Sequence, residues 1–257
     1  MTKPGQAMLE LHHWEPAGDS LKALVCLNEK RLEFRGHYLD ILDFAQFRPE
    51  YLELATFGQV PVLVHNGTVF SEPRLLLEYL EDAFPQPAFA PADAAGWYDV
   101  QEWIRYADAQ MGASVNLIGW HKVMLPAMSD GEQKAFSDRL AKVPVKEQQA
   151  GWAAVVRDAE STENRTGNAQ GKIREAIDRV ETTLAKSSWL VGDAYTIADI
   201  NAFAWVNALP GLMPGDVSEA KSPKTLAWLR KIAERPAVTR ALAMGRRATG
   251  SGGFPPP

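Results

Sequence analysis

The sequence predicts a two-domain protein in which an α/β domain precedes an all-helical domain. Three observations predict it: strand and helix patterns alternate at the start, a stretch rich in proline and alanine follows, and the apolar period is helical after that. The 257 residues are enough for two cores. We expect an α/β domain at 1–86, a linker at 87–96, a helical domain at 97–245 and a disordered tail at 246–257.

The first domain begins with a strand and a helix. In the segment MLELHHW (8–14), apolar residues occupy alternate positions, which indicates a strand. Ser20 is the predicted N-cap of the next helix, whose apolar stripe includes Leu21, Leu24 and Val25. This pair of elements opens a β-α-β unit.

The rest of the first domain ends in a hairpin and a helix. A second strand is expected at 32–40 and a short helix at 49–54. Asn66-Gly67 separates two β-rich runs, which predicts a type I′ hairpin. A helix follows from Pro73. The order β-α-β-α-β-β-α, with a parallel first pair, is that of a thioredoxin-like domain.

The second domain has a helical period throughout. Its helix at 196–209 is nearly all apolar, so we expect that helix in the centre of the domain. The expected helices lie at 97–125, 129–140, 147–159, 171–187, 196–209 and 222–238.

The composition narrows the class of function. The chain has 27 basic and 32 acidic residues and no basic cluster, which argues against a nucleic-acid partner. The N-terminus lacks the apolar run of a signal peptide, and no segment reaches the ~20 apolar residues of a membrane span. Cys26 is the only cysteine, and no acidic residue or cysteine accompanies His12-His13 at the spacing of metal ligands. We expect a cytoplasmic protein without a metal, membrane or nucleic-acid site.

Several motifs make the chain resemble a cytosolic glutathione transferase. Gly58–Leu63 (GQVPVL) is similar to the family's loop in which the residue before a cis-proline offers its main chain to glutathione. Ser71-Glu72 resembles the turn that holds the γ-glutamyl end. Thr196–Asp199 (TIAD) matches the capping box of the central helix. Val143–Trp152 (VPxxEQQxxW) is further similar to the bacterial β-etherase group, which cleaves β-aryl ethers of lignin-derived aromatics.

The resemblance implies glutathione as the cosubstrate and Ser20 as the catalytic residue. Ser20 would donate a hydrogen bond to the glutathione sulfur at the positive end of a helix dipole. A serine at a helix start is also typical of a plain N-cap, and one residue can fill both roles. The implied glutathione contacts are Asp19, Gln46, Gln59, Val60, Pro61, Glu72 and Pro73.

Three residues depart from the family pattern at this site. Asp19 would place a carboxylate near the sulfur, which raises the pKa of a thiol. Phe57 replaces a polar or basic residue and cannot bind a carboxylate. Pro73 replaces a serine, so the α-carboxylate of glutathione loses a hydroxyl and an N–H, although Arg74 follows and could supply charge.

The implied substrate is an aromatic ether. In the β-etherase reaction, the glutathione thiolate displaces a phenolate from the carbon next to a ketone. Aromatic residues at helical spacing are also typical of a core, so both readings stay open for them. The candidate substrate residues are His13, Trp14, Trp103, Tyr106 and Trp120.

Two functions are therefore open. The chain is either a glutathione-dependent β-etherase in its own right, or a catalytically weak or inactive subunit paired with a paralogous active β-etherase. The resemblance implies a dimer in both cases, a homodimer or a heterodimer.

Overall fold

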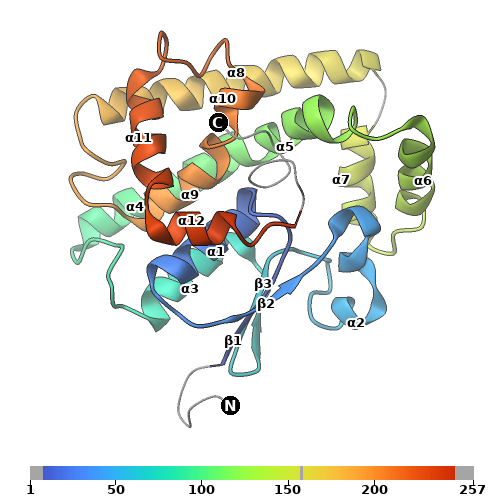
Figure 1. The fold of residues 1–257 in the computed structure, drawn as a ribbon, viewed down its shortest axis with the longest axis horizontal. Helices are drawn as coiled ribbons and strands as arrows, with labels where there is room; N and C mark the ends of the chain where they lie inside the picture. The colour runs from blue at the N-terminus through green and yellow to red at the C-terminus, as the bar shows by residue number, and fades with distance from the viewer. Residues whose placement is uncertain (1–7, 157–158, 247–257) are drawn as a thin grey trace.

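The structure is a computed structural model that describes residues 8–156 and 159–246 (Figure 1). The predicted disordered tail lies outside these residues except for Arg246, for which the prediction is wrong. The main-chain N–H of Arg246 donates to both carboxylate oxygens of Glu15 (3.2 and 3.1 Å). Its guanidinium lies 4.4 Å from the ring centre of Tyr38.

The sheet has the strand order β2-β1-β3-β4. The first two strands are parallel and the other neighbours are antiparallel, as the sequence predicts. In β1 the buried residues are Leu9, Leu11 and His13, which share the face under α1 and α3. The strands are β1 (Leu9–His13), β2 (Arg35–Tyr38), β3 (Val62–His65) and β4 (Thr68–Phe70).

The β3–β4 hairpin and the loop before it have the predicted backbone. Asn66 and Gly67 both have positive φ angles, 50° and 83°, as a type I′ turn requires. The Val60–Pro61 peptide bond is cis, as the family resemblance implies. Both features confirm the interpretation of this segment.

Helix α1 (Gly18–Glu29) belongs to the first domain and packs against the second. It begins earlier than predicted. Its N-cap is Ala17, so the prediction of Ser20 as the N-cap is wrong, and Ser20 is instead the third helical residue. The helix packs against α9 (Ile197–Val206) and α12 (Pro236–Leu242) of the second domain. Gly18 has a φ of 50°, and a Cβ there would lie 2.6 Å from the Trp205 ring. A distant side chain therefore sets where the helix starts.

Two further α-helices belong to the first domain, which also has short 3-10 helices at Ile41–Asp43 and Ala45–Phe47. Helix α2 (Pro49–Leu52) is the predicted short helix. The predicted helix from Pro73 begins as a 3-10 turn (Pro73–Leu75) and continues as α3 (Leu76–Ala83).

The long helix of the second domain is interrupted twice by π-helical turns. It consists of α4 (Ala94–Ala107), a π turn (Asp108–Gly112), α5 (Ala113–Gly119) and a second π turn (Trp120–Met124). Because α4 begins at Ala94, the last residues of the predicted linker are helical. Each π turn adds a residue to the helical turn and so changes which side chains face α1.

Helix α9 is buried along its whole length and packs against α1, α4, α10 and α11, whereas α6 and α7 lie at the far end of the second domain (Figure 1). Thr196 and Asp199 form the predicted capping box. Helix α8 begins before the predicted position 171, and the last predicted helix is divided at Arg235–Pro236. The predicted helix at 147–159 includes 157–158, which lie outside the described residues. The remaining helices are α6 (Asp130–Leu140), α7 (Lys146–Val156), α8 (Ala159–Leu184), α10 (Leu209–Leu212) and α11 (Pro223–Ala233).

One hydrophobic core runs through both domains. It includes Leu21 and Leu24 of α1 together with Phe203 of α9, each at most 1% exposed. A second cluster, around Trp120 and Phe136, lies beside it next to α6. Within residues 8–156 and 159–246, no helix is both long and apolar enough to cross a membrane.

Candidate functional site

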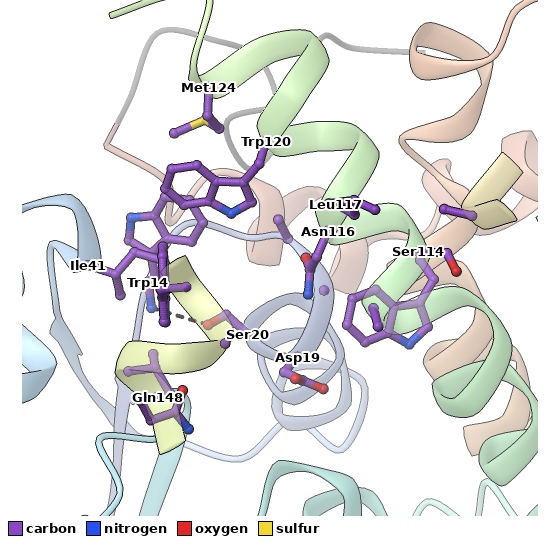
Figure 2. Close-up of a pocket in the computed structure, with 18 of the residues that line it drawn as sticks. Trp14, Asp19, Ser20, Ile41, Ser114, Asn116, Leu117, Trp120, Met124 and Gln148 are labelled. Carbon is purple, nitrogen blue, oxygen red and sulfur yellow. Dashed lines mark hydrogen bonds between the residues drawn. The ribbon is translucent and has the colours of Figure 1, made fainter. Parts of the chain in front are cut away.

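A cavity of about 760 Å³ lies between the start of α1 and the helices α5, α7 and α8 (Figure 2). Its volume is in the range of small-molecule sites. The first domain contributes Trp14, Ala17, Gly18, Asp19, Ser20, Ile41 and Val60, and the second contributes Asn116, Leu117, Trp120, Met124, Gln148, Trp152, Lys172 and Trp205, among others.

Ser20 is at the α1 end of this cavity and is 4% exposed. The main-chain N–H of Trp14 donates to Ser20 Oγ at 3.2 Å. That bond uses a lone pair of the oxygen, so the hydroxyl proton stays available for donation. The first turn of α1 adds the positive end of its dipole at the same place. Ser20 can therefore stabilise an anion in the cavity.

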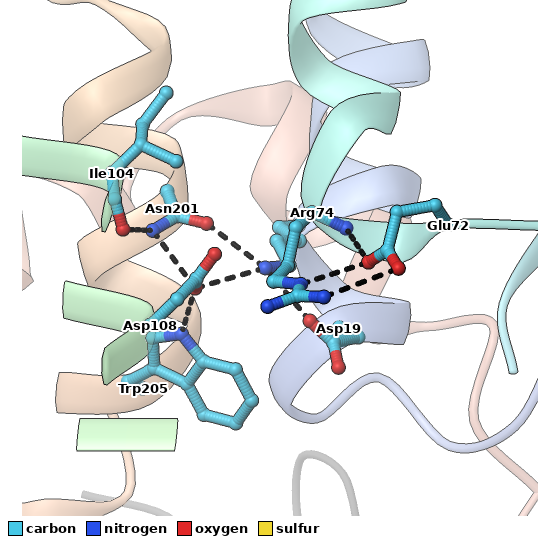
Figure 3. Close-up of polar contacts among 8 residues, drawn as sticks. Asp19, Glu72, Arg74, Ile104, Asp108, Asn201 and Trp205 are labelled. Atoms are coloured by element: carbon cyan, nitrogen blue, oxygen red, sulfur yellow. Dashed lines mark hydrogen bonds and ion pairs between the residues drawn. The ribbon is translucent and has the colours of Figure 1, made fainter. Parts of the chain in front are cut away.

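A buried charge network lies behind the first turn of α1 (Figure 3). Lys22 is 1% exposed, and its Nζ lies 2.7 Å from Asp19 Oδ1 and 3.0 Å from Asp108 Oδ1. It also donates to Asn201 Oδ1 at 3.0 Å. The same Asp108 oxygen accepts from Trp205 Nε1 (2.9 Å) and Asn201 Nδ2 (3.2 Å). The network ties α1 to α9 and to the first π turn.

Asp19 faces the cavity while paired with Lys22. Removal from water raises the pKa of the Asp19 carboxyl, and Lys22 opposes that rise. Because Asp19 adjoins Ser20, its charge would act on any anion that Ser20 stabilises.

We expect Asp19→Asn to lower the pKa of a glutathione thiol bound in the cavity by about one unit, because it removes a negative charge near the sulfur. The amide can still accept the hydrogen bond from Lys22. The measurement is the ultraviolet absorbance of the thiolate against pH. Asp130→Asn, on exposed α6, serves as the control. A thiol pKa that stays constant or rises in Asp19→Asn would contradict the expectation.

The cis-proline loop presents main-chain groups at the cavity. Val60 lines the cavity, and no described residue hydrogen-bonds its N–H or C=O. The neighbouring Gln59 has its carbonyl bonded by the Tyr51 hydroxyl at 2.6 Å, and that bond holds the loop. Unpaired main-chain groups of this kind suit a peptide ligand.

Glu72 is paired with Arg74 at the surface. Its Oε1 accepts from Arg74 Nε at 2.9 Å and from the Arg74 main-chain N–H at 3.2 Å. The hydrogen bond from the Arg74 side chain holds the pKa of Glu72 below its ordinary value, so the carboxylate is ionised at neutral pH. Exposed ion pairs of this kind are weak, and a ligand ammonium can compete for Glu72. Pro73 between them offers no N–H.

Aromatic side chains form the wall opposite α1. The Trp120 ring lies 4.9 Å from the Trp152 ring in a T-shaped pair. Trp14 and Met124 complete this wall, which is apolar and suits an aromatic ligand. The predicted motif at 143–152 supplies Gln148 and Trp152 to the cavity through α7.

The structure brings only part of the predicted site to the cavity lining. Glu72 lies close enough to raise the pKa of Asp19. Gln59 and Pro61 flank Val60, and Pro73 is buried at the start of its 3-10 turn. The predicted residues that line the cavity are Trp14, Asp19, Ser20, Val60 and Trp120.

Besides Gln59, Pro61, Glu72 and Pro73, four more predicted residues do not line the cavity. His13 is 2% exposed and its Nδ1 donates to the Trp14 carbonyl at 2.6 Å, because β1 alternation turns it under the sheet. Gln46 is buried, at 2% exposure. Trp103 and Tyr106 flank the guanidinium of Arg179 at 4.5 and 4.1 Å, on the part of α4 that faces α8 away from the cavity.

Other cavity residues were not predicted. Trp205 lies on the helix that we predicted to be buried in the centre of the second domain. Its ring reaches the cavity because Gly18 and Gly112 have no side chains to block it. Asn116 and Lys172 stand on helices without any local motif. Gln148, Gly151 and Trp152 could have been selected beforehand, since they lie within the motif at 143–152.

Within the part of the chain that the structure describes, no group of three or more His, Cys, Asp or Glu side chains could hold a metal ion. The single cysteine, Cys26, is buried, and burial raises its pKa to about 12. The cavity offers the hydroxyls of Ser20 and Ser114, a helix N-terminus and an aromatic wall.

A thioredoxin-like domain, a helical domain and a cavity between them define a two-domain transferase fold. The chain belongs to the glutathione S-transferase family. The family model "Glutathione S-transferase, N-terminal domain" matches residues 20–83, and "Glutathione S-transferase, C-terminal domain" matches residues 145–236.

Relatives and solved structures agree with this assignment. Protein LigF of Sphingobium sp. (strain NBRC 103272 / SYK-6) is 35% identical over 93% of this chain and 95% of its own length. Glutathione S-transferase 3 of Zea mays is 24% identical over 92% and 94%. The crystal structure of β-etherase LigF from Sphingobium sp. strain SYK-6 has a TM-score of 0.82, 32% identity and coverage of 92% and 99%. A Burkholderia graminis glutathione transferase, solved with two glutathione molecules per subunit, has a TM-score of 0.70, 24% identity and coverage of 94% and 90%.

Proposed function

We propose that this chain is a glutathione-dependent β-etherase that cleaves the ether bond between a phenol and the carbon next to an aryl ketone. The similarity to β-etherase LigF supports the reaction class. The observation that carries the proposal is the cavity itself, which joins the Ser20 hydroxyl to a wall of tryptophans.

The residues present fit glutathione at one end of the cavity. Ser20 and the first turn of α1 would hold the sulfur, the main chain of Val60 would pair with the peptide, and Glu72 would bind the ammonium. A free thiol has a pKa of about 8.5, so these donors are needed to favour the thiolate at neutral pH.

The aromatic substrate would lie against the wall that Trp14 and Trp120 form. The glutathione sulfur forms a bond to the carbon next to the ketone while the carbon–oxygen bond to the phenol breaks, and the phenolate takes the electron pair and a proton from water. The chain's own residues activate the sulfur and orient the two reactants.

The experiment is a turnover assay with glutathione and a 2-aryloxy-1-arylethanone. We expect release of one phenol and formation of one glutathione thioether per ether consumed, followed by liquid chromatography. Phenol release without a thioether, or no release at all, would reject the proposal.

A second candidate function rests on the surface at Glu72. Arg74 is hydrogen-bonded to the Glu72 carboxylate, and Pro73 has no main-chain N–H to offer a ligand. The second candidate is therefore a weakly active subunit that pairs with a paralogous active β-etherase. Calorimetric titration separates the two candidates: no heat at millimolar glutathione favours the second.

If Pro73 weakens the glutathione site, Pro73→Ser is expected to tighten glutathione binding about tenfold, because a hydroxyl and an N–H become available to a carboxylate. Titration calorimetry measures the change. Pro236→Ser is the matched control, since Pro236 also stands at the start of a helix but away from the cavity. Unchanged or weaker binding in Pro73→Ser would show that Pro73 is not what limits affinity.

A further inference from the structure

Asn116 is an amide on an otherwise largely apolar face of the long helix. The cavity residues around it on α5 and the second π turn are Ala113, Ser114, Leu117, Trp120 and Met124, and all of these except Ser114 are apolar and share the helical face of Asn116. Asn116 is exposed, and its side chain makes no hydrogen bond to any described residue. An unpaired amide among apolar side chains is available to a ligand.

The Asn116 amide points from α5 toward the start of α1, where Ser20 and Asp19 lie (Figure 2). The Ser20 hydroxyl on one wall and the Asn116 amide on the other therefore face each other across the space. Trp120 and Leu117 flank Asn116 on its own wall and are apolar.

In an in-line displacement, Ser20 and Asn116 would contact different reacting atoms. A sulfur held at Ser20 attacks the carbon from the side opposite the leaving oxygen, so that oxygen must face away from α1. It then faces α5, where Asn116 supplies an N–H and the aromatic wall can receive the departing ring.

We propose that Asn116 is a catalytic residue whose Nδ2–H donates to the phenolate oxygen as the ether bond breaks. This inference rests on the proposed function and adds the leaving-group contact to it. The carbon–sulfur bond forms as the carbon–oxygen bond breaks, the phenolate keeps the electron pair, and Asn116 shares but does not transfer its proton. Water protonates the phenolate after release.

The kinetic test compares leaving groups of different basicity. With 2-methoxyphenol as the leaving group, Asn116→Leu is expected to lower kcat about 100-fold, which is the scale for losing one donor to a developing oxyanion. With 4-nitrophenol, which is a weaker base, the loss is expected to be much smaller. Asn116→Asp is expected to be at least as slow as Asn116→Leu, because a carboxylate repels the phenolate.

A general structural fault would slow both substrates equally, and an equal loss would overturn the proposal. Gln110→Leu is the matched control, since Gln110 is an amide on the same long helix outside the cavity lining. It is expected to leave both rates unchanged.

Binding of the product tests the contact without turnover. The spectral change of 4-nitrophenolate on binding to the glutathione-loaded chain gives its affinity, which Asn116→Leu should weaken about tenfold. Equal affinity in the two proteins, or no binding to the natural chain, would overturn the role of Asn116. If Asn116→Leu binds 4-nitrophenolate more weakly but the natural chain cleaves no ether, the result rejects the proposed function and supports the contact between Asn116 and the phenolate.

Discussion

Ser20→Ala is expected to lower kcat for ether cleavage about 100- to 1000-fold, the scale for removing one donor to a catalytic anion. The Ser20 hydroxyl proton is free to donate because Trp14 N–H already occupies a lone pair of the oxygen. Without this donor, the thiol pKa in the complex should rise toward its free value of about 8.5. Thiolate absorbance against pH measures this shift, and steady-state kinetics measures kcat.

The fold should tolerate the change. Ser20 is not the N-cap, so alanine removes one bond to a main-chain N–H, worth about 1 kcal/mol. Ser137→Ala on the exposed face of α6 is the control for a serine outside the cavity. An unchanged thiolate profile in Ser20→Ala would mean that helix α1 alone activates the sulfur.

The backbone plan was predictable from the sequence because its signals are local. Alternation in β1, the Asn66-Gly67 turn and the Thr196–Asp199 capping box each depend on neighbours within a few residues. The cis bond at Pro61 and the aromatic contribution of Trp120 also followed from local motifs and the family resemblance.

The errors came from contacts between distant segments. The start of α1 depends on Trp205, whose ring leaves room only for a glycine at position 18. Trp103 and Tyr106 have the helical spacing of a cleft wall, yet Arg179 of α8 decides where they point. Asn116 has no sequence signal, since its role depends on the wall that it faces.

The ion pair between Lys22 and Asp108 is the contact between distant segments that was hardest to predict from the sequence. Eighty-six residues separate the two, and Asn201 lies 179 residues from Lys22. For a lysine on an apolar helix stripe, the sequence predicts that the ammonium group reaches solvent. The ammonium group of Lys22 is instead buried. Enclosed charges are costly unless paired, so the three elements that supply the partners must be in place together.

Asp108→Ala is therefore expected to lower the free energy of unfolding by about 3 kcal/mol, the lower end for breaking a buried ion pair, because Asp19 still balances Lys22. The side chain of Asp108 is 11% exposed, and its loss leaves Trp205 Nε1 without an acceptor. Urea unfolding followed by circular dichroism measures the change. Trp205→Phe removes a single donor to Asp108 and should cost less.

The matched control is Asp138→Ala, which breaks the exposed pair with Lys134 on α6. Both side chains of that pair are well exposed, at 77% and 61%, so no measurable change in the unfolding midpoint is expected. If Asp108→Ala and Asp138→Ala had the same midpoint, the network would not hold the domains together. In that case water, rather than Asp108, would satisfy Lys22, and the position of Gly18–Ser20 would depend on packing against Trp205 alone.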